Sequence, residues 1–299
     1  MTRRLLLTGL AAALGGTLLA LPAQAAGLAQ GPADTAAAAA PAAVAAGPLL
    51  AALSPGNTAV FQWNGSSWAQ IGGPASSIVS GGGILVATNP GTGDLYRYDG
   101  SSWARIGGPG RQFAVDGAGR VYGLSPDGSG VFQWTGGTSW RQIGGPAGSI
   151  VAGGDTLVAT NPSSGDVYRY DGSSWARIGG PGSQFAVDSW GRVYGLTPDR
   201  SGVFRWNGSG TAWTQVGGPA GSIVAGGGGT LLATNPSSGD VYRYDGSAWA
   251  RIGGPGAEFV IDGAGRVYGL SPNRGGVFQW TGGTAWSQVG GPAGWLTAS

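Results

Sequence analysis

Most polar side chains that could bind a ligand recur at fixed positions along the chain. One sequence, VYRYDGSSWARIGGP at Val167–Pro181, has near-copies at Leu95–Pro109 and Val241–Pro255. Each copy supplies an arginine between two tyrosines, a tryptophan, and an arginine two residues after that tryptophan. These sets are Arg97, Arg169 and Arg243; Trp103, Trp175 and Trp249; and Arg105, Arg177 and Arg251. Aromatic rings and guanidinium groups can stack on and hydrogen-bond to a sugar-like ligand, so several equivalent binding sites are expected.

Two further sets of hydrogen-bonding side chains recur in the connecting segments. An asparagine precedes proline in three turns, and a glutamine follows a Gly-Gly-Pro segment twice: Asn89, Asn161 and Asn235; Gln112 and Gln184. In an antiparallel repeat both kinds of connection fall on one face, so these amides are candidate ligand contacts. The alternative for all these sets is structural. Asparagine starts turns before proline, and arginine stems pack between sheets while their heads bind carbonyls or aspartate.

Enzyme chemistry finds little support in the same residues. The chain has no cysteine and no histidine, which removes the thiolate nucleophile and the commonest general base. A glycoside hydrolase needs two facing carboxylates about 5–9.5 Å apart, but most acids here occupy repeated turn positions. Glu258 is an exception, and it stands where sister repeats have Gln112 and Gln184. No catalytic residue is expected.

A metal or a cofactor is not expected either. Calcium needs several oxygen ligands gathered in one loop, and the segment Pro126–Gly130 offers only the carboxylate of Asp127. The aspartates that follow the aromatic strands, Asp99, Asp171 and Asp245, precede glycine and are typical of hairpin turns.

Charge argues against nucleic acid as a partner. All 16 basic residues are arginines. Two of them, Arg3 and Arg4, lie in the predicted export signal described next, and the remaining arginines balance the 14 acids. Proteins that bind nucleic acid normally carry a basic stripe, whereas this mature chain is expected to be neutral.

The first 48 residues indicate an export signal and a linker. A pair of arginines precedes the apolar run Leu5–Leu21, and an A-x-A cleavage site ends at Ala25. Residues 1–25 are predicted to be an export signal of twin-arginine type, with an ordinary secretory signal as the alternative. Glycines interrupt the run, so no stable membrane insertion is expected. Residues 26–48 are nearly all Ala, Pro and Gly and predict a flexible linker, and the product is expected to be secreted.

Seven tryptophans spaced 35 to 38 residues apart mark an internal repeat: Trp68, Trp103, Trp140, Trp175, Trp213, Trp249 and Trp286. A period in this range signals a solenoid, propeller or array. One unit divides into four short strands, Ser149–Ala152, Thr156–Thr160, Val167–Tyr170 and Trp175–Ile178, separated by Gly, Asn, Asp and Pro turns. A four-stranded unit repeated radially is a β-propeller blade, so residues 49–299 are predicted to form an all-β, seven-bladed propeller.

The ends of the chain are predicted to share one blade. The final segment Gly294–Ser299 matches a first strand but has no second strand after it, while Leu49–Pro55 matches the second strand at Val121–Pro126. One C-terminal and three N-terminal strands would therefore complete a blade and close the ring, which also hides both sheet edges. The repeats alternate between a YRYDG type and a VFQW type, and with seven repeats the alternation must fail once, at the closure.

The consensus W-x-x-[IV]-G-G-P, followed by a short β run, [AG]-[TL]-[NS]-P and [VL]-[YF]-x-[YW], resembles the tectonin-type β-propeller repeat, which is related to the tachylectin propellers. The resemblance covers the chain beyond the linker. It implies binding of glycans or cell-surface polysaccharide at equivalent sites around the ring. The chain departs from the family in having seven repeats rather than six and in its high glycine content.

The sequence thus favours a secreted, non-catalytic, lectin-like propeller with multivalent carbohydrate-binding sites and no cofactor. The alternative is an extracellular scaffold that binds a protein at a non-repeated patch, around Trp190 or Trp295. A propeller enzyme is the least favoured interpretation.

Overall fold

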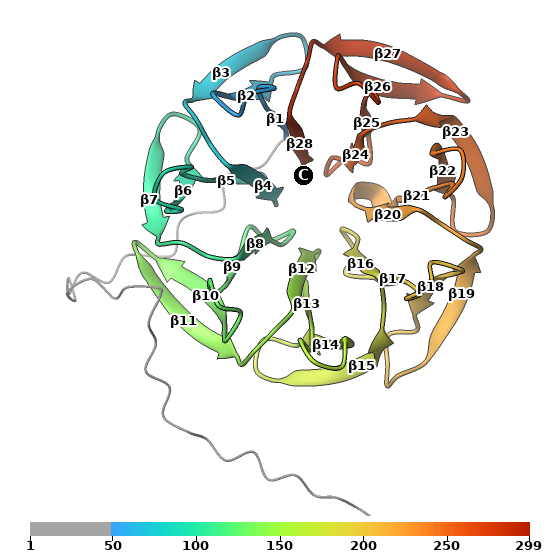
Figure 1. Cartoon of the computed structure of the whole chain (residues 1–299), viewed down its shortest axis with the longest axis horizontal. Helices are drawn as coiled ribbons and strands as arrows, with labels where there is room; N and C mark the ends of the chain where they lie inside the picture. The colour runs from blue at the N-terminus through green and yellow to red at the C-terminus, as the bar shows by residue number, and fades with distance from the viewer. Residues whose placement is uncertain (1–48) are drawn as a thin grey trace, which may run out of the picture.

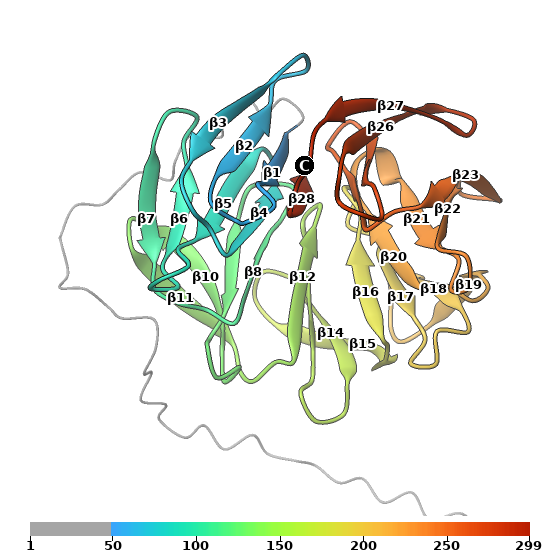
Figure 2. The same cartoon turned by 45° about the horizontal axis from the view of Figure 1, so that its top comes forward.

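Seven four-stranded antiparallel sheets stand around a central axis as the blades of a propeller (Figure 1, Figure 2). The structure is a computed structural model that describes residues 49–299. The predicted export signal and linker lie outside the described residues. The prediction of an all-β, seven-bladed propeller is confirmed.

Each blade has four strands of four to seven residues, with the first strand at the centre of the ring and the fourth at its rim. Blade 1 consists of β28 (Trp295–Ala298), β1 (Leu50–Leu53), β2 (Val60–Trp63) and β3 (Trp68–Gly72). Blade 2 consists of β4 (Ser77–Gly81), β5 (Ile84–Thr88), β6 (Leu95–Tyr98) and β7 (Trp103–Gly107). Blade 3 consists of β8 (Gln112–Val115), β9 (Val121–Leu124), β10 (Val131–Gly136) and β11 (Ser139–Gly144).

The remaining four blades follow the same order. Blade 4 consists of β12 (Ser149–Gly153), β13 (Thr156–Thr160), β14 (Asp166–Tyr170) and β15 (Trp175–Pro181). Blade 5 consists of β16 (Gln184–Val187), β17 (Val193–Leu196), β18 (Val203–Trp206) and β19 (Trp213–Gly217). Blade 6 consists of β20 (Ser222–Ala225), the short 3-10 turn η1 (Gly227–Gly229), β21 (Leu231–Thr234), β22 (Asp240–Tyr244) and β23 (Trp249–Pro255). Blade 7 consists of β24 (Glu258–Ile261), β25 (Val267–Leu270), β26 (Val277–Gly282) and β27 (Ala285–Gly290).

The antiparallel order sorts the connections between the two faces of the ring. Turns from first to second and from third to fourth strands lie on one face, called here the hairpin face. Turns from second to third strands, and loops leading to the next blade, lie on the other, called here the pocket face. The two kinds of connection on the pocket face meet, as the bond from Gly148 N to Thr160 O (2.8 Å) shows.

The ring closes through blade 1 as predicted. Strand β28 pairs antiparallel with β1, with Leu50 opposite Ala298 and Leu53 opposite Trp295. Beyond the strands, Leu49 N donates to Ser299 O (2.7 Å) and Ser299 N donates to Leu49 O (2.9 Å). These two bonds take the place of the turn that joins first and second strands in the other six blades.

The apolar core is divided among the seven interfaces between neighbouring blades. Between blades 4 and 5, for example, Val158, Val167 and Ile178 pack against Val187 and Val193, and all five are buried. Each blade therefore has two buried faces, because it contacts a neighbour on either side. Successive side chains along a strand point to opposite faces of the sheet, so each strand contributes apolar side chains to both buried faces.

The repeated tryptophan joins each blade to the one before it. Its indole Nε1 donates to the carbonyl of the Ile or Val in the fourth strand of the preceding blade, at 2.6 to 2.8 Å. The bond occurs at all seven interfaces, including the closure, where Trp68 bonds to Val289. Because the donor and acceptor lie in different blades, these bonds fix the spacing between sheets.

The glycine after that Ile or Val is required by the same contact. A Cβ on Gly179 would lie 2.7 Å from Nε1 of Trp213, and the six equivalent glycines give distances of 2.6 to 3.0 Å. Real Cβ atoms do not approach another atom this closely, so packing of the indole across the interface requires the first glycine of the [IV]-G-G-P motif.

A side-chain amide bridges neighbouring first strands at two interfaces. Gln112 Nε2 donates to Ile150 O (2.7 Å) while its Oε1 accepts from Ile150 N (3.0 Å), and Gln184 bridges to Ile223 in the same way. Gln112 and Gln184 are the first residues of β8 and β16.

Glu258 occupies the same position next to the closing strand. It accepts from Leu296 N (2.9 Å), but a carboxylate has no N–H for the strand carbonyl that the glutamines reach. Burial raises the pKa of Glu258 to about 7, against the bond from Leu296 N and the positive charge of Arg274, which both lower it. Arg274 itself donates to the carbonyl of Gly294, just before β28.

We predict that Trp213→Phe lowers the free energy of unfolding by about 1–3 kcal/mol, because Ile178 O loses its donor in a buried interface. Trp190→Phe is the matched control, since Trp190 is 66% exposed and should change stability little. Chemical denaturation measures both. Equal stability of Trp213→Phe and the wild type would contradict the proposed role of the indole bond.

We predict that Glu258→Gln stabilises the ring at pH 8 by roughly 1–3 kcal/mol and has little effect at pH 4.5. The folded-state pKa of Glu258 lies above its unfolded value, so its stabilising contribution is present at low pH and is lost as the pH rises from about 4.5 to about 7. Urea denaturation of both proteins across this range tests the prediction. A constant difference in stability at all pH values would refute it.

Candidate functional site

Three equivalent pockets open on the pocket face, between blades 1 and 2, 3 and 4, and 5 and 6. Their volumes are 200, 280 and 330 Å³. Each is walled by the Gly-Gly-Pro-Ala loop of a VFQW- or VFRW-type blade and by the Asn turn of the following YRY-type blade. In the 3/4 pocket the lining includes Pro146, Ala147, Asn161, Tyr168 and Trp175. The volumes are at or below the lower end of the ~300–1,000 Å³ typical of small-molecule sites, so each pocket suits a single sugar-sized group.

The asparagine of each pocket is held in one orientation. Oδ1 of Asn161 accepts from the backbone N–H groups of Ser163 (2.8 Å) and Ser164 (3.0 Å). Asn89 and Asn235 make the same pair of bonds. Within residues 49–299 the Nδ2 groups of these asparagines have no acceptor, so each pocket presents an amide donor that is positioned but unused.

The aromatic residues of the pocket have different functions. The Nε1 of Trp175 donates to Ile143 O (2.7 Å). A ligand could therefore contact the indole ring but could not accept a hydrogen bond from its N–H. The hydroxyl of Tyr168, in contrast, makes no hydrogen bond within the described chain, and the same holds for Tyr96 and Tyr242. The pocket thus combines an apolar wall with two free polar groups, a combination suited to the apolar and hydroxylated faces of a sugar.

The tyrosines Tyr96, Tyr168 and Tyr242 were not predicted as site residues. The YRY alternation contained the signal, because it places Tyr168 on the face opposite Arg169. What could not be read from the sequence is that the proline loop of the neighbouring blade leaves the first tyrosine of the pair uncovered.

The second arginine set lies beside the pockets. Arg177 stands opposite Tyr168 on the neighbouring strand, and its guanidinium forms an ion pair with Asp166 (3.0 Å). This hydrogen bond holds the pKa of Asp166 below its usual value. Arg105 and Arg251 make the equivalent pairs with Asp94 and Asp240.

The other predicted site residues lie apart from the pockets. Gln112 and Gln184 bridge first strands, as described above. The first arginine set, Arg97, Arg169 and Arg243, points to the opposite interface of each blade and lies over a tryptophan of the next blade. The structure therefore gathers the predicted asparagines and tryptophans at common sites and separates the glutamines and these arginines from them.

The alternate interfaces do not repeat the pocket chemistry. The cavity between blades 6 and 7 (220 Å³) has Ser271 and Phe278 where the 5/6 pocket has Asn235 and Tyr242. The two free polar groups of the 5/6 pocket therefore have no counterpart here. Phe278 has no hydroxyl, and the hydroxyl of Ser271 is already bonded to Asn273 and to Gly276 N. The ring of Phe259 also lines this cavity. The two blade types thus produce two kinds of interface.

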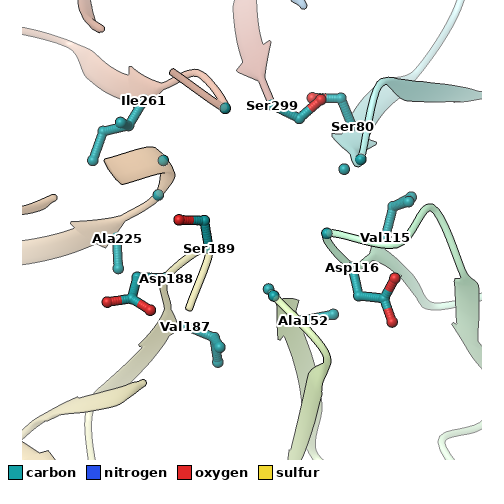
Figure 3. A pocket seen from close by; sticks show the side chains of 18 of the residues that line it. Ser80, Val115, Asp116, Ala152, Val187, Asp188, Ser189, Ala225, Ile261 and Ser299 are labelled. Carbon is teal, nitrogen blue, oxygen red and sulfur yellow. The ribbon is translucent and has the colours of Figure 1, made fainter. Parts of the chain in front are cut away.

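A cavity of 840 Å³, larger than each of the pockets described above, lies at the centre of the ring on the hairpin face (Figure 3). Its wall is mainly the backbone of glycine turns. The buried carboxylates near it, Asp116, Asp188 and Asp262, are each bound by an arginine four residues on and by a tyrosine hydroxyl. Burial and the neighbouring carboxylate raise the pKa of Tyr268 to about 12. These acids stabilise turns and offer no free oxygen for catalysis.

Three features of the described residues 49–299 concern metal binding, membrane insertion and the hairpin aspartates. No group of three His, Cys, Asp or Glu side chains is close enough to hold a metal ion. No helix in this part of the chain is long and apolar enough to cross a membrane. Asp99, Asp171 and Asp245 accept from backbone N–H groups of their own hairpins, which lowers the pKa of each carboxyl.

No known family model and no curated protein matches the sequence. The fold is similar to that of virginiamycin B lyase from Staphylococcus aureus, whose catalytically inactive variant with quinupristin aligns with a TM-score of 0.53 and 11% identity over 73% of this chain and 86% of that one. It is also similar to the acylaminoacyl peptidase of Pyrococcus horikoshii, with a TM-score of 0.59 and 16% identity over 81% of this chain and 51% of that one. At these identities the likeness establishes the propeller fold alone.

Proposed function

We propose that the chain is a secreted, non-catalytic carbohydrate-binding propeller of tectonin type, which binds one sugar residue in each of three equivalent pockets. The observation that carries the proposal is the threefold recurrence of a small apolar pocket with an oriented, unused asparagine amide and a free tyrosine hydroxyl. The recurrence of the pocket around one ring supports multivalent binding. Three weak sites on one rigid ring gain avidity, on the order of 10²–10⁴, when they engage one surface.

The residues present favour binding over catalysis. The similar lyase becomes inactive when a histidine is replaced by alanine, and this chain contains no histidine. The pockets hold no carboxylate, and Glu258 is committed to the closing strand. An acid–base pair of the kind that cleaves glycosides is therefore missing from the pockets.

A protein-interaction scaffold is the second candidate, favoured by two tryptophans outside the repeat. Trp190 is 66% exposed and Trp295 is 46% exposed, whereas the repeated tryptophans are half-buried. Exposed tryptophans often anchor protein interfaces. A scaffold would bind one partner per ring at such a patch, whereas a lectin should bind three ligands.

A glycan array, probed with the chain from Ala26 onward and including bacterial polysaccharides and O-methylated sugars, tests the proposal. Titration calorimetry with the sugar identified by the array should then give three sites per chain with similar affinities. A blank array, or one ligand per ring, would instead favour the scaffold.

We predict that Asn161→Asp lowers the calorimetric stoichiometry from three to two without changing the thermal midpoint. The carboxylate can still accept from Ser163 N and Ser164 N, but it cannot donate to a ligand. Asn64→Asp is the matched control, because Asn64 accepts the same kind of turn bonds on the hairpin face. A stoichiometry of three in Asn161→Asp would contradict the assignment of the pocket.

A further inference from the structure

Three equivalent arginines have no hydrogen-bond partner within residues 49–299. The Nε atoms of Arg97, Arg169 and Arg243 are the only buried side-chain polar atoms in this part of the chain without a partner. Their sisters Arg105, Arg177 and Arg251 are all ion-paired. An unpaired buried N–H group normally destabilises a folded protein, and its recurrence in three blades directs attention to these arginines.

Each of these guanidinium groups lies over an aromatic ring of the next blade, within cation–π distance. Cζ of Arg169 lies 5.8 Å from the ring centre of Trp206, and the pairs Arg97–Trp134 and Arg243–Trp280 give 5.8 and 5.6 Å. The indole is itself fixed, because Trp206 Nε1 donates to Gly210 O (3.0 Å) in the hairpin that follows β18. Trp134 and Trp280 make the corresponding bonds. The indole that each guanidinium faces is thus anchored to its own hairpin, near the hairpin face.

Each of these guanidinium groups has one end that is buried and one that is not. Nε is sealed from solvent, whereas the two terminal nitrogens, which also lack a protein acceptor, are not among the buried atoms. No carboxylate lies within 4 Å of any of the three groups. The exposed end of a guanidinium offers two parallel N–H donors, which match the two oxygens of a carboxylate, sulfate or phosphate.

We propose that Arg97, Arg169 and Arg243 form three anion subsites, at the interfaces between blades 2 and 3, 4 and 5, and 6 and 7, for the acidic groups of an anionic polysaccharide. None of these three interfaces has a sugar pocket, so from blade 1 to blade 7 the two kinds of site alternate and lie toward opposite faces, and within residues 49–299 only the closing interface between blades 7 and 1 has neither. The subsites go beyond the proposed function, because they need neither Asn161 nor its sister residues. A polymer is favoured over a free ion, because three fixed positive groups can engage one polyanion together.

Dextran sulfate and unmodified dextran, which share a backbone and differ in charge, provide the test. The full chain should bind dextran sulfate at 150 mM salt and should not bind dextran at this face. The triple variant Arg97→Gln, Arg169→Gln, Arg243→Gln should weaken binding to dextran sulfate at least tenfold. The triple variant Arg105→Gln, Arg177→Gln, Arg251→Gln removes the same charge and should weaken it less than threefold.

Equal losses in the two triple variants, or no binding of dextran sulfate by the wild type, would overturn the proposal. Replacement of the three arginines by lysine keeps the charge but loses the paired donors, so wild-type affinity in that variant would also count against it. Thermal melting checks that the variants fold. Should the triple variant unfold, Arg169→Gln against Arg177→Gln gives the same comparison at one site. Polygalacturonate and polyphosphate in place of dextran sulfate show whether carboxylate or phosphate is preferred.

Discussion

The hydrogen bond from each repeated indole to the fourth strand of the preceding blade is the contact on which the rest of the ring depends. It sets the distance between sheets at all seven interfaces, and it requires a glycine next to its acceptor at each of them. The high glycine content follows in part from this contact. Because seven nearly identical contacts hold the ring together, residues outside these contacts can vary. The two blade types differ at such residues.

The alternation of those two types determines where ligands can bind. A YRY-type blade contributes an asparagine turn and a free tyrosine on one side and an arginine without a hydrogen-bond partner on the other. Its neighbours contribute a proline loop to the first interface and a tryptophan platform to the second. Because seven is odd, two VFQW-type blades meet at the closure, between blades 7 and 1. This interface is held by Trp68, Glu258 and the carboxyl-terminal strand.

Most of the fold could be predicted, because short turn and strand patterns and the regular spacing of the repeats determine it. The spacing of the tryptophans gave the number of blades, and the unpaired segment Gly294–Ser299 gave the closure. The candidate site was harder to predict, because its residues come from two blades. Which of its polar groups are free for a ligand depends on how the side chains and loops of the two blades pack together. Nothing in the sequence separates Trp175, whose N–H is occupied, from Tyr168, whose hydroxyl is free. The same limit applies to the arginines: Arg177 and Arg169 recur equally often, yet one is ion-paired and the other is not.

The three-pocket assignment can be tested by a crystal structure of the chain with a sugar identified on the glycan array. Ligand density is expected in the pockets between blades 1 and 2, 3 and 4, and 5 and 6, in contact with Asn89, Asn161 and Asn235 and with the adjoining tyrosines. Density confined to the central cavity, to the surroundings of Trp190, or spread equally over all seven interfaces would contradict it.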